Sequence, residues 1–164
     1  MNYKEKYQSW LESPFIDEKT KEELLAIQDN EEEIKDRFHQ DLEFGTAGLR
    51  GIIAAGSNRM NQYTVGLATE ALARTIEDEG AEAKKRGVAI AYDVRHKSKE
   101  FAQITAGVLA KHGIKVYIHK EIQPTPILSY TIRHLKTISV TSVRCPGRAA
   151  GMPKAWHAAS AGPA

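Results

Sequence analysis

The spacing of apolar residues along the chain changes near residue 48. Before this point the apolar positions recur at helical spacing among many polar residues, and they predict two or three short helices within residues 2–40. Trp10 and Leu11 lie on the apolar side of the first helix. Asp17 and Asn30 are the predicted N-caps of the helices that follow, because a short acceptor side chain can bond to free helix N–H groups. The aromatic residues of this region are expected to pack against the main domain rather than contact a ligand.

From residue 48 onward, short apolar runs alternate with longer stretches of helical spacing. Strands are predicted at residues 49–54, 88–92, 114–118 and 137–143. Helices are predicted at residues 63–85, 99–111 and 124–135, with Gly87 and Gly113 at the ends of the first two. Ser98 is the expected N-cap of the second helix. The first helix is expected to bury an apolar stripe formed by Val65, Leu67, Ala68, Ala71, Leu72 and Ile76.

This alternation of strands and helices predicts an α/β fold. We expect a three-layer α-β-α sandwich with a mixed, mostly parallel four-stranded sheet, preceded by the short N-terminal helices. Ligands of such folds bind beyond the carboxyl ends of the strands, where loops converge. The loops after residues 92 and 143 are therefore candidate binding regions.

Composition and charge narrow the possible partners. The chain has 164 residues, 41% of them hydrophobic and 27% charged, which is ordinary for a globular domain. Its net charge of +2 is too small to indicate nucleic acid or a membrane as partner, and no apolar run approaches membrane length. Residues 1–43 hold 13 acidic and 6 basic residues, which we interpret as solvated helical faces. A single cysteine, Cys145, excludes an internal disulfide and favours the reducing cytoplasm.

The motif Phe44-Gly-Thr-Ala-Gly-Leu-Arg-Gly51 is the main candidate for chemistry. Its three glycines allow the backbone to approach an anion closely, and the hydroxyl of Thr46 can donate to one. Arg50 adds a planar fork of N–H donors that matches phosphate oxygens. The motif fits neither a P-loop nor a dinucleotide-binding motif. Two alternatives stay open: a plain turn before a strand, and an Arg50 that pairs with a nearby carboxylate.

A second candidate lies in the loop after residues 88–92. Asp93 and Arg95 can form a buried pair that shapes this loop, or Arg95 can face a ligand; the structural pair is the favoured interpretation. His96 is expected at the surface. The remaining histidines show no spacing typical of metal ligands, so no metal site is predicted.

Five ordered motifs resemble the N-terminal part of the α-D-phosphohexomutases, especially the phosphoglucomutase/phosphopentomutase branch. In chain order they are Phe44-Gly-Thr-Ala-Gly-Leu-Arg-Gly51, Gly56-Ser-Asn-Arg-Met-Asn61 with Tyr63-Thr-Val65, Ala91-Tyr-Asp-Val-Arg-His-Lys-Ser98, Gly113-Ile-Lys-Val-Tyr117 and Gln123-Pro-Thr-Pro-Ile-Leu128. The acidic helical lead-in is also similar to that branch. The resemblance covers about residues 1–138 and is specific, because five motifs agree in order and spacing.

The resemblance implies the first domain of a phospho-sugar mutase, an isomerase of carbohydrate and glucose metabolism. Such an enzyme transfers a phosphate between the 1- and 6-positions, or the 1- and 5-positions, of a sugar phosphate. Mg²⁺ and a sugar bisphosphate activator are implied for the intact enzyme, and neither is expected to bind this chain tightly. Thr46, Arg50 and Arg95 are the candidate phosphate- or substrate-binding residues.

The family's phosphoserine loop, Thr-Ala-Ser-His-Asn-Pro, is implied shortly after Leu135-Lys-Thr137. This chain instead reads Ser139-Val-Thr-Ser-Val-Arg-Cys-Pro-Gly-Arg148, and Ser-His-Asn-Pro occurs nowhere in it. Ser142 lies near the implied position of the catalytic serine. It lacks the following His-Asn-Pro, and a hydroxyl becomes nucleophilic only beside a base or a preorganised anion site. We therefore predict no catalytic residue in this chain.

The composition also changes at this point. Half of residues 139–164 are Ala, Gly or Pro, and no acidic residue follows Glu121. We interpret this end as a foreign tail, of frameshifted, misjoined or fused origin, and expect residues 144–164 to be disordered. The predicted division is a helical extension at residues 1–43, an incomplete phosphohexomutase-like domain I at 44–143, and the tail. The chain is then either the first domain of a mutase, inactive alone, or a non-catalytic remnant that only binds anions or another protein.

Overall fold

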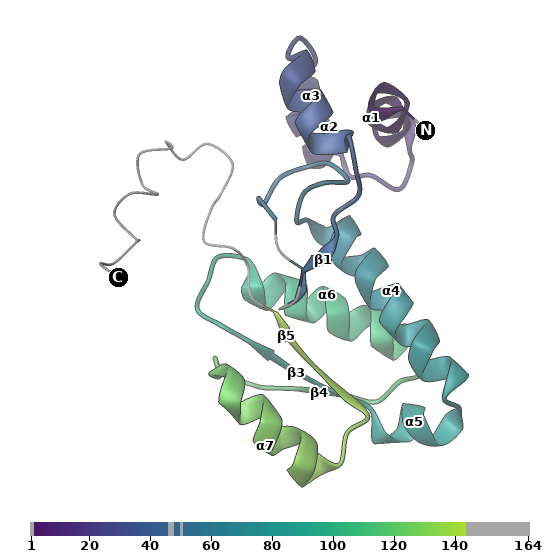
Figure 1. Cartoon of the computed structure of the whole chain (residues 1–164), viewed down its shortest axis with the longest axis vertical. Helices are drawn as coiled ribbons and strands as arrows, with labels where there is room; N and C mark the ends of the chain where they lie inside the picture. Colours follow the sequence, from purple (N-terminus) through teal and green to yellow (C-terminus); the bar gives the residue numbers. More distant parts are fainter. Residues whose placement is uncertain (1, 46–47, 50, 144–164) are drawn as a thin grey trace.

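The computed structural model describes residues 2–45, 48–49 and 51–143 (Figure 1). In chain order the elements are α1 (Tyr3–Glu12), α2 (Glu18–Leu25), α3 (Glu31–Phe38), β1 (Phe44–Gly45), β2 (Gly48–Leu49), α4 (Gln62–Asp78), α5 (Ala81–Arg86), β3 (Val88–Tyr92), α6 (Ser98–Lys111), β4 (Val116–Ile118), α7 (Thr125–Leu135) and β5 (Ser139–Val143). Within this part of the chain no helix is long and apolar enough to cross a membrane.

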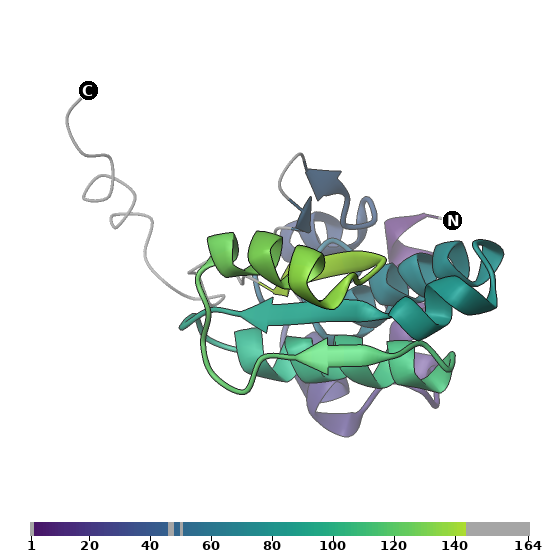
Figure 2. The ribbon, with the colours of Figure 1, turned by 90° about the horizontal axis from the view of Figure 1, so that it is seen from below.

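The central sheet has three parallel strands in the order β4-β3-β5. All five residues of β3 are buried, which explains why residues 88–92 form a continuous apolar run without alternation. Helices α6 and α7 cover opposite faces of the sheet, and α4 packs on α6 (Figures 1 and 2). The predicted α/β class is confirmed, and the layers follow the expected helix, sheet, helix order.

The four-stranded sheet was not found in the described residues. The predicted strand at 49–54 divides instead: β2 pairs antiparallel with β1, and Ile53 makes a single bridge to Met60. Leu49 and Ile53 nevertheless pack against the main hydrophobic core. Ile52 of the same run is 41% exposed, so only part of the run is buried, and the backbone hydrogen bonds of its described residues are local rather than part of the central sheet.

The long helix predicted at 63–85 is two helices, α4 and α5. Gly80 separates them in a left-handed conformation with φ of 94°. The predicted apolar stripe also needs correction, because Leu67 is 72% exposed and Ala71 is exposed as well. The residues that α4 buries are Val65, Thr69, Ala73 and Ile76. The stripe is displaced because α6 packs on the side of α4 opposite Leu67.

A second, smaller core joins the N-terminal helices to the α/β domain. Its buried residues are Leu24, Ile34, Phe38 and Ala55. Trp10 packs edge-on against Phe38 and Tyr63, at centroid distances of 5.6 and 5.4 Å. Because Tyr63 belongs to α4, Trp10 packs against the main domain as expected, whereas Phe15 is 87% exposed and does not follow the expectation. Asp17 and Asn30 cap α2 and α3 as predicted.

Candidate functional site

The glycine motif at residues 44–51 forms a tight antiparallel pair of strands. Phe44 pairs with Leu49 and Gly45 with Gly48. Thr46 and Arg50, the two predicted donors in this motif, lie outside the described residues. A Cβ at Gly51 would lie 2.8 Å from Leu42 Cδ1, so the Leu42 side chain would have to shift to admit a larger residue.

The turn at residues 54–61 is hydrogen-bonded to the residues on either side of this motif, and Asn61 holds the turn in shape. The Asn61 amide nitrogen donates to the carbonyl oxygens of Ala54 and Gly56, at 3.0 and 2.8 Å. Its oxygen accepts from the N–H groups of Tyr63 and Thr64, which caps α4. One side chain thus fixes both the turn and the start of the helix.

The loop after β3 carries the second predicted site. Arg95 Nε lies 3.4 Å from Asp93 Oδ2, and these side chains are 42% and 21% exposed. Asp93 also accepts from the Arg95 N–H and from the Ser98 hydroxyl, at 3.1 and 2.7 Å. The favoured pairing of Asp93 with Arg95 is therefore present, but the pair is not buried. The predicted N-cap was wrong: Lys97, with φ of 64°, occupies that position, and Ser98 is the first helical residue.

A cleft of about 910 Å³ opens between the N-terminal helices and the α/β domain. Its walls include Lys19 of α2, Ile53 and Ala54 behind the glycine motif, and His96 and Lys97 at the start of α6. The cleft therefore connects the segment after the glycine motif with the loop after β3. Sequence patterns did not reveal it, because its walls come from elements far apart in the chain.

Asp17 ties one wall of the cleft to α4. Its Oδ2 accepts hydrogen bonds from the hydroxyl groups of Tyr63 and Thr20, at 2.5 and 2.7 Å, and from the Gln62 amide at 2.7 Å. The Tyr63 bond is the main reason why the pKa of Asp17 falls to about 2, with the Thr20 bonds contributing further. Asp17 is thus an ionised acceptor that fixes α2 against α4.

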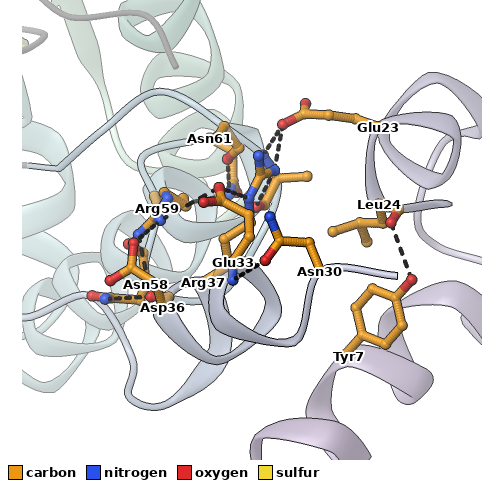
Figure 3. A network of polar contacts seen from close by, with 12 residues as sticks. Tyr7, Glu23, Leu24, Asn30, Glu33, Asp36, Arg37, Asn58, Arg59 and Asn61 are labelled. Carbon is orange, nitrogen blue, oxygen red and sulfur yellow. Dashed lines mark hydrogen bonds and ion pairs between the residues drawn. The ribbon is translucent and has the colours of Figure 1, made fainter. Parts of the chain in front are cut away.

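The structure brings forward two arginines for which the sequence suggested no role. Arg37 of α3 and Arg59 of the 54–61 turn are both buried, with exposed fractions of 5% and 4%, among several carboxylates (Figure 3). The Glu33–Arg37 spacing on one helix is a signal that sequence reasoning can use. The contacts of Arg37 with Glu23 and of Arg59 with Asp36 join different elements, and no local pattern predicts them.

The sequence also predicts no metal site and places Ser142 near the implied position of the catalytic serine. In residues 2–45, 48–49 and 51–143 no group of three or more His, Cys, Asp or Glu side chains is placed to hold a metal ion. Ser142 lies in β5, where it pairs in register with Ala91 of β3. This position is one residue before the end of the strand.

Comparisons with known proteins agree with this arrangement. Residues 41–147 match the sequence model of the family described as phosphoglucomutase/phosphomannomutase, alpha/beta/alpha domain I. The chain is 35% identical over 156 residues to a phosphopentomutase of Mus musculus, covering 90% of this chain and 25% of that protein. It is 43% identical over 105 residues to a phosphoglucomutase of Staphylococcus aureus (strain bovine RF122 / ET3-1), covering 64% of this chain and 18% of that protein. The chain thus spans a quarter or less of the length of these relatives, and no solved structure matches it.

Proposed function

We propose that this chain, which belongs to the phosphoglucomutase/phosphomannomutase family and carries its α/β/α domain I, is the first domain of a phospho-sugar mutase. The transfer would run between the 1- and 6-positions or the 1- and 5-positions of a sugar phosphate. Relatives named phosphoglucomutase and phosphopentomutase support these two alternatives. The proposed domain division is residues 1–43, 44–143 and 144–164, and the proposed compartment is the cytoplasm.

The observation that carries this proposal is the glycine motif within the family match. Its three glycines carry no Cβ that would keep an anion from the backbone, and two of them, Gly45 and Gly48, face each other in the β1–β2 pair. We assign Arg50 and Thr46 to phosphate binding by their chemistry, since guanidinium and hydroxyl groups both donate to phosphate oxygens. We also assign Arg95, in the loop after β3, to substrate binding. Its ion pair with Asp93 would hold the guanidinium in position.

The intact family implies Mg²⁺, which would neutralise charge on the transferring phosphate. The described residues do not fit that role, because they provide no cluster of three or more metal-ligating side chains. We therefore derive no catalytic step through a metal for this chain.

A chain of this sequence is proposed to lack mutase activity and to bind phosphate weakly. It contains no Ser-His-Asn-Pro, and Ser142 has no residue in that pattern to activate it. One charge-assisted contact contributes about 1.5–3 kcal/mol, which corresponds to millimolar affinity or weaker. The alternative is a non-catalytic anion-binding or interaction domain, and the missing serine motif favours it for the chain taken alone.

Phosphate titration followed by NMR tests the assignment. The amides of Gly45, Gly48 and Gly51 are expected to shift, and Arg50→Ala should abolish the response. Arg74→Ala is the matched control, since Arg74 is an exposed arginine that pairs only with Glu70 in the described part of the chain. Shifts confined to the basic residues Arg144 and Arg148 would contradict the assignment.

An activity assay tests the proposed inactivity of the chain. With glucose 1-phosphate, glucose 1,6-bisphosphate and Mg²⁺ we expect no turnover above the blank. Turnover that Ser142→Ala abolishes would show that the chain is a working mutase and would refute the proposed inactivity.

A further inference from the structure

Two buried arginines hold the turn that lies behind the glycine motif. Arg37 Nε donates to Glu33 Oε1 at 2.8 Å, and Arg37 Nη1 donates to Glu23 Oε1 at 2.6 Å. The same Nη1 reaches the carbonyl oxygen of Ala55 at 3.2 Å, while the Ala55 N–H donates to Glu23 at 3.0 Å. Arg37 therefore ties α2 and α3 to the first residues of the turn (Figure 3).

Arg59 performs the same task at the other end of the turn. Its Nη2 is paired with the Asp36 carboxylate, and its Nη1 donates to the Asp36 carbonyl oxygen at 3.2 Å and to that of Asn58 at 3.0 Å. The Asn58 side chain also donates to the Asp36 carbonyl oxygen, at 2.9 Å. The Asn58 N–H donates to the Arg37 carbonyl oxygen at 2.8 Å, so the turn is bonded to the C-terminal end of α3 through side chains and backbone together.

This turn is in turn bonded to both ends of the glycine motif. The N–H of Leu42, just before the motif, donates to the Ser57 carbonyl oxygen at 2.9 Å. The carbonyl oxygen of Ile52, just after the motif, accepts from the Met60 N–H at 2.8 Å. Residues 43–51 thus span two anchor points that are only three residues apart on the same turn. A shift of the turn must move both ends of the motif.

The position of Arg59 excludes direct contact with a ligand. The residue is 4% exposed, its Nε is buried without a hydrogen-bond partner in the described structure, and its other nitrogens serve internal contacts. Arg37 and Arg59 also face three carboxylates, those of Glu23, Glu33 and Asp36. The cluster therefore has no excess positive charge with which to bind an anion.

We infer that Arg59, paired with Asp36, is a positioning residue that fixes the backbone of the glycine motif through the 54–61 turn. Through Asp36 and Arg37, α3 holds the 54–61 turn in place, and the turn in its place holds the two ends of the glycine motif. A guanidinium is suited to the role because it donates in several fixed directions at once, which an ammonium group does not. This inference rests on the proposed phosphate-binding function for its ligand, but the geometry of the empty loop tests it separately.

The test compares Arg59→Met, Arg59→Lys and Asp36→Asn with the parent chain. The first readout is the set of amide chemical shifts of Gly45, Gly48 and Gly51 without phosphate. The second is the phosphate dissociation constant from titration. Asp36→Asn removes the charge of Asp36 at nearly unchanged size while Arg59 stays buried, so a loss of stability is expected and is compared with that of the control. Ile76→Ala is the stability control, because Ile76 is buried in the main core far along α4 from the turn.

We expect the three glycine amides to move in all three variants before phosphate is added, and phosphate affinity to fall about tenfold in Arg59→Met, equivalent to one lost interaction of ordinary strength. Arg59→Lys should not restore the parent shifts. Ile76→Ala should lose stability while the glycine amides and the phosphate affinity remain those of the parent. Parent-like glycine shifts in Arg59→Met and Asp36→Asn, or an equal affinity loss in Ile76→Ala, would overturn the inference. If the parent chain does not respond to phosphate, only the proposed function is refuted. The glycine amide shifts measured without phosphate still decide whether Arg59 positions the motif.

Discussion

At the scale of single residues, Gly87 lies where three backbone segments meet. Its φ is 72°, and a Cβ at this position would lie 2.1 Å from the carbonyl oxygen of Lys115. That oxygen accepts from the Val88 N–H at 2.8 Å, and the Gly87 carbonyl accepts from Ile138 at 2.9 Å. The residue therefore joins the end of α5 to the starts of β3, β4 and β5.

Gly87→Ala is expected to lower the free energy of unfolding by about 3 kcal/mol, because the added methyl group overlaps a backbone oxygen and the left-handed conformation becomes strained. Urea unfolding measures the change. Gly107→Ala is the control: Gly107 lies within α6 with no atom near its Cβ position, so the same substitution should stabilise by about 0.5–1 kcal/mol. Equal stabilities for the two variants would contradict this account.

His112 is the residue whose titration should affect stability near neutral pH. Its Nε2 lies 2.8 Å from Glu70 and its Nδ1 lies 3.2 Å from Glu77, which also pairs with Lys84. The bonds to Glu70 and then Glu77 raise the pKa of His112 above 6.5, since both carboxylates favour the charged ring. The folded protein holds this proton more tightly than the unfolded chain. Its contribution to stability is therefore fully present below pH 6.5 and is lost as the pH rises through the raised pKa.

The free energy of unfolding of the parent should accordingly fall as the pH rises from about 6.5, and His112→Gln should reduce this slope. Chemical unfolding at a series of pH values measures both. The exposed His39, whose ring contacts only backbone carbonyl oxygens in the described structure, provides the control variant His39→Gln. Identical slopes for the parent and His112→Gln would show that the cluster does not couple to folding.

At the scale of elements, α3 is a short helix that contacts both the other N-terminal helices and the 54–61 turn. Its apolar side presents Phe38, fully buried, to the rings of Tyr7 and Trp10. Its C-terminal residues hold the 54–61 turn through Asp36 and Arg37. An eight-residue helix is marginal by itself, so its stability must come from this packing.

Phe38→Ala is expected to destabilise the N-terminal helices by about 3–5 kcal/mol, because a large aromatic ring is removed from a closed core. Trp10 fluorescence should report the loss, with Trp156→Phe introduced in every variant to leave one tryptophan. Phe15→Ala serves as the control, since Phe15 is 87% exposed and its loss should change little. If both variants unfold at the same urea concentration, the helices do not depend on this core.

At the scale of the whole molecule, the two hydrophobic cores meet along the turn at residues 54–61. Met60 belongs to the core of the α/β domain, and Ala55 belongs to the core of the N-terminal helices. Tyr63 and Asp17 add a second connection through their hydrogen bonds. The helical extension and the α/β domain are therefore expected to stabilise one another.

Hydrogen exchange should show this organisation. The amides of β3 are expected to exchange most slowly, because the strand is buried and paired on both sides. Those of β4 should exchange faster, since β4 pairs with β3 alone and Ile118 is 43% exposed. Faster exchange in β3 than in β4 would mean that the described sheet is not the most stable part of the fold.

Much of the fold follows from local patterns. Asp17 and Asn30 cap their helices through bonds to residues three positions on, and the apolar run at residues 88–92 forms the buried strand that its composition predicts. The glycine motif and the order of the other motifs were sufficient to indicate the family. These features are legible in sequence because capping and helix periodicity depend on residues close together in the chain, and a continuous apolar run is the pattern that a strand covered on both faces requires.

Tertiary structure alone decided the rest. Leu49 and Ile53 of the apolar run at 49–54 pack on the core without joining the central sheet. The Ile52 carbonyl oxygen accepts instead from the Met60 N–H, eight residues further on. Leu67 is exposed because α6 covers another side of α4. Arg59 meets Asp36 across 23 residues of chain. Each outcome depends on which groups distant in the chain lie together in the folded structure, and a one-dimensional pattern of apolar and polar residues does not contain that information.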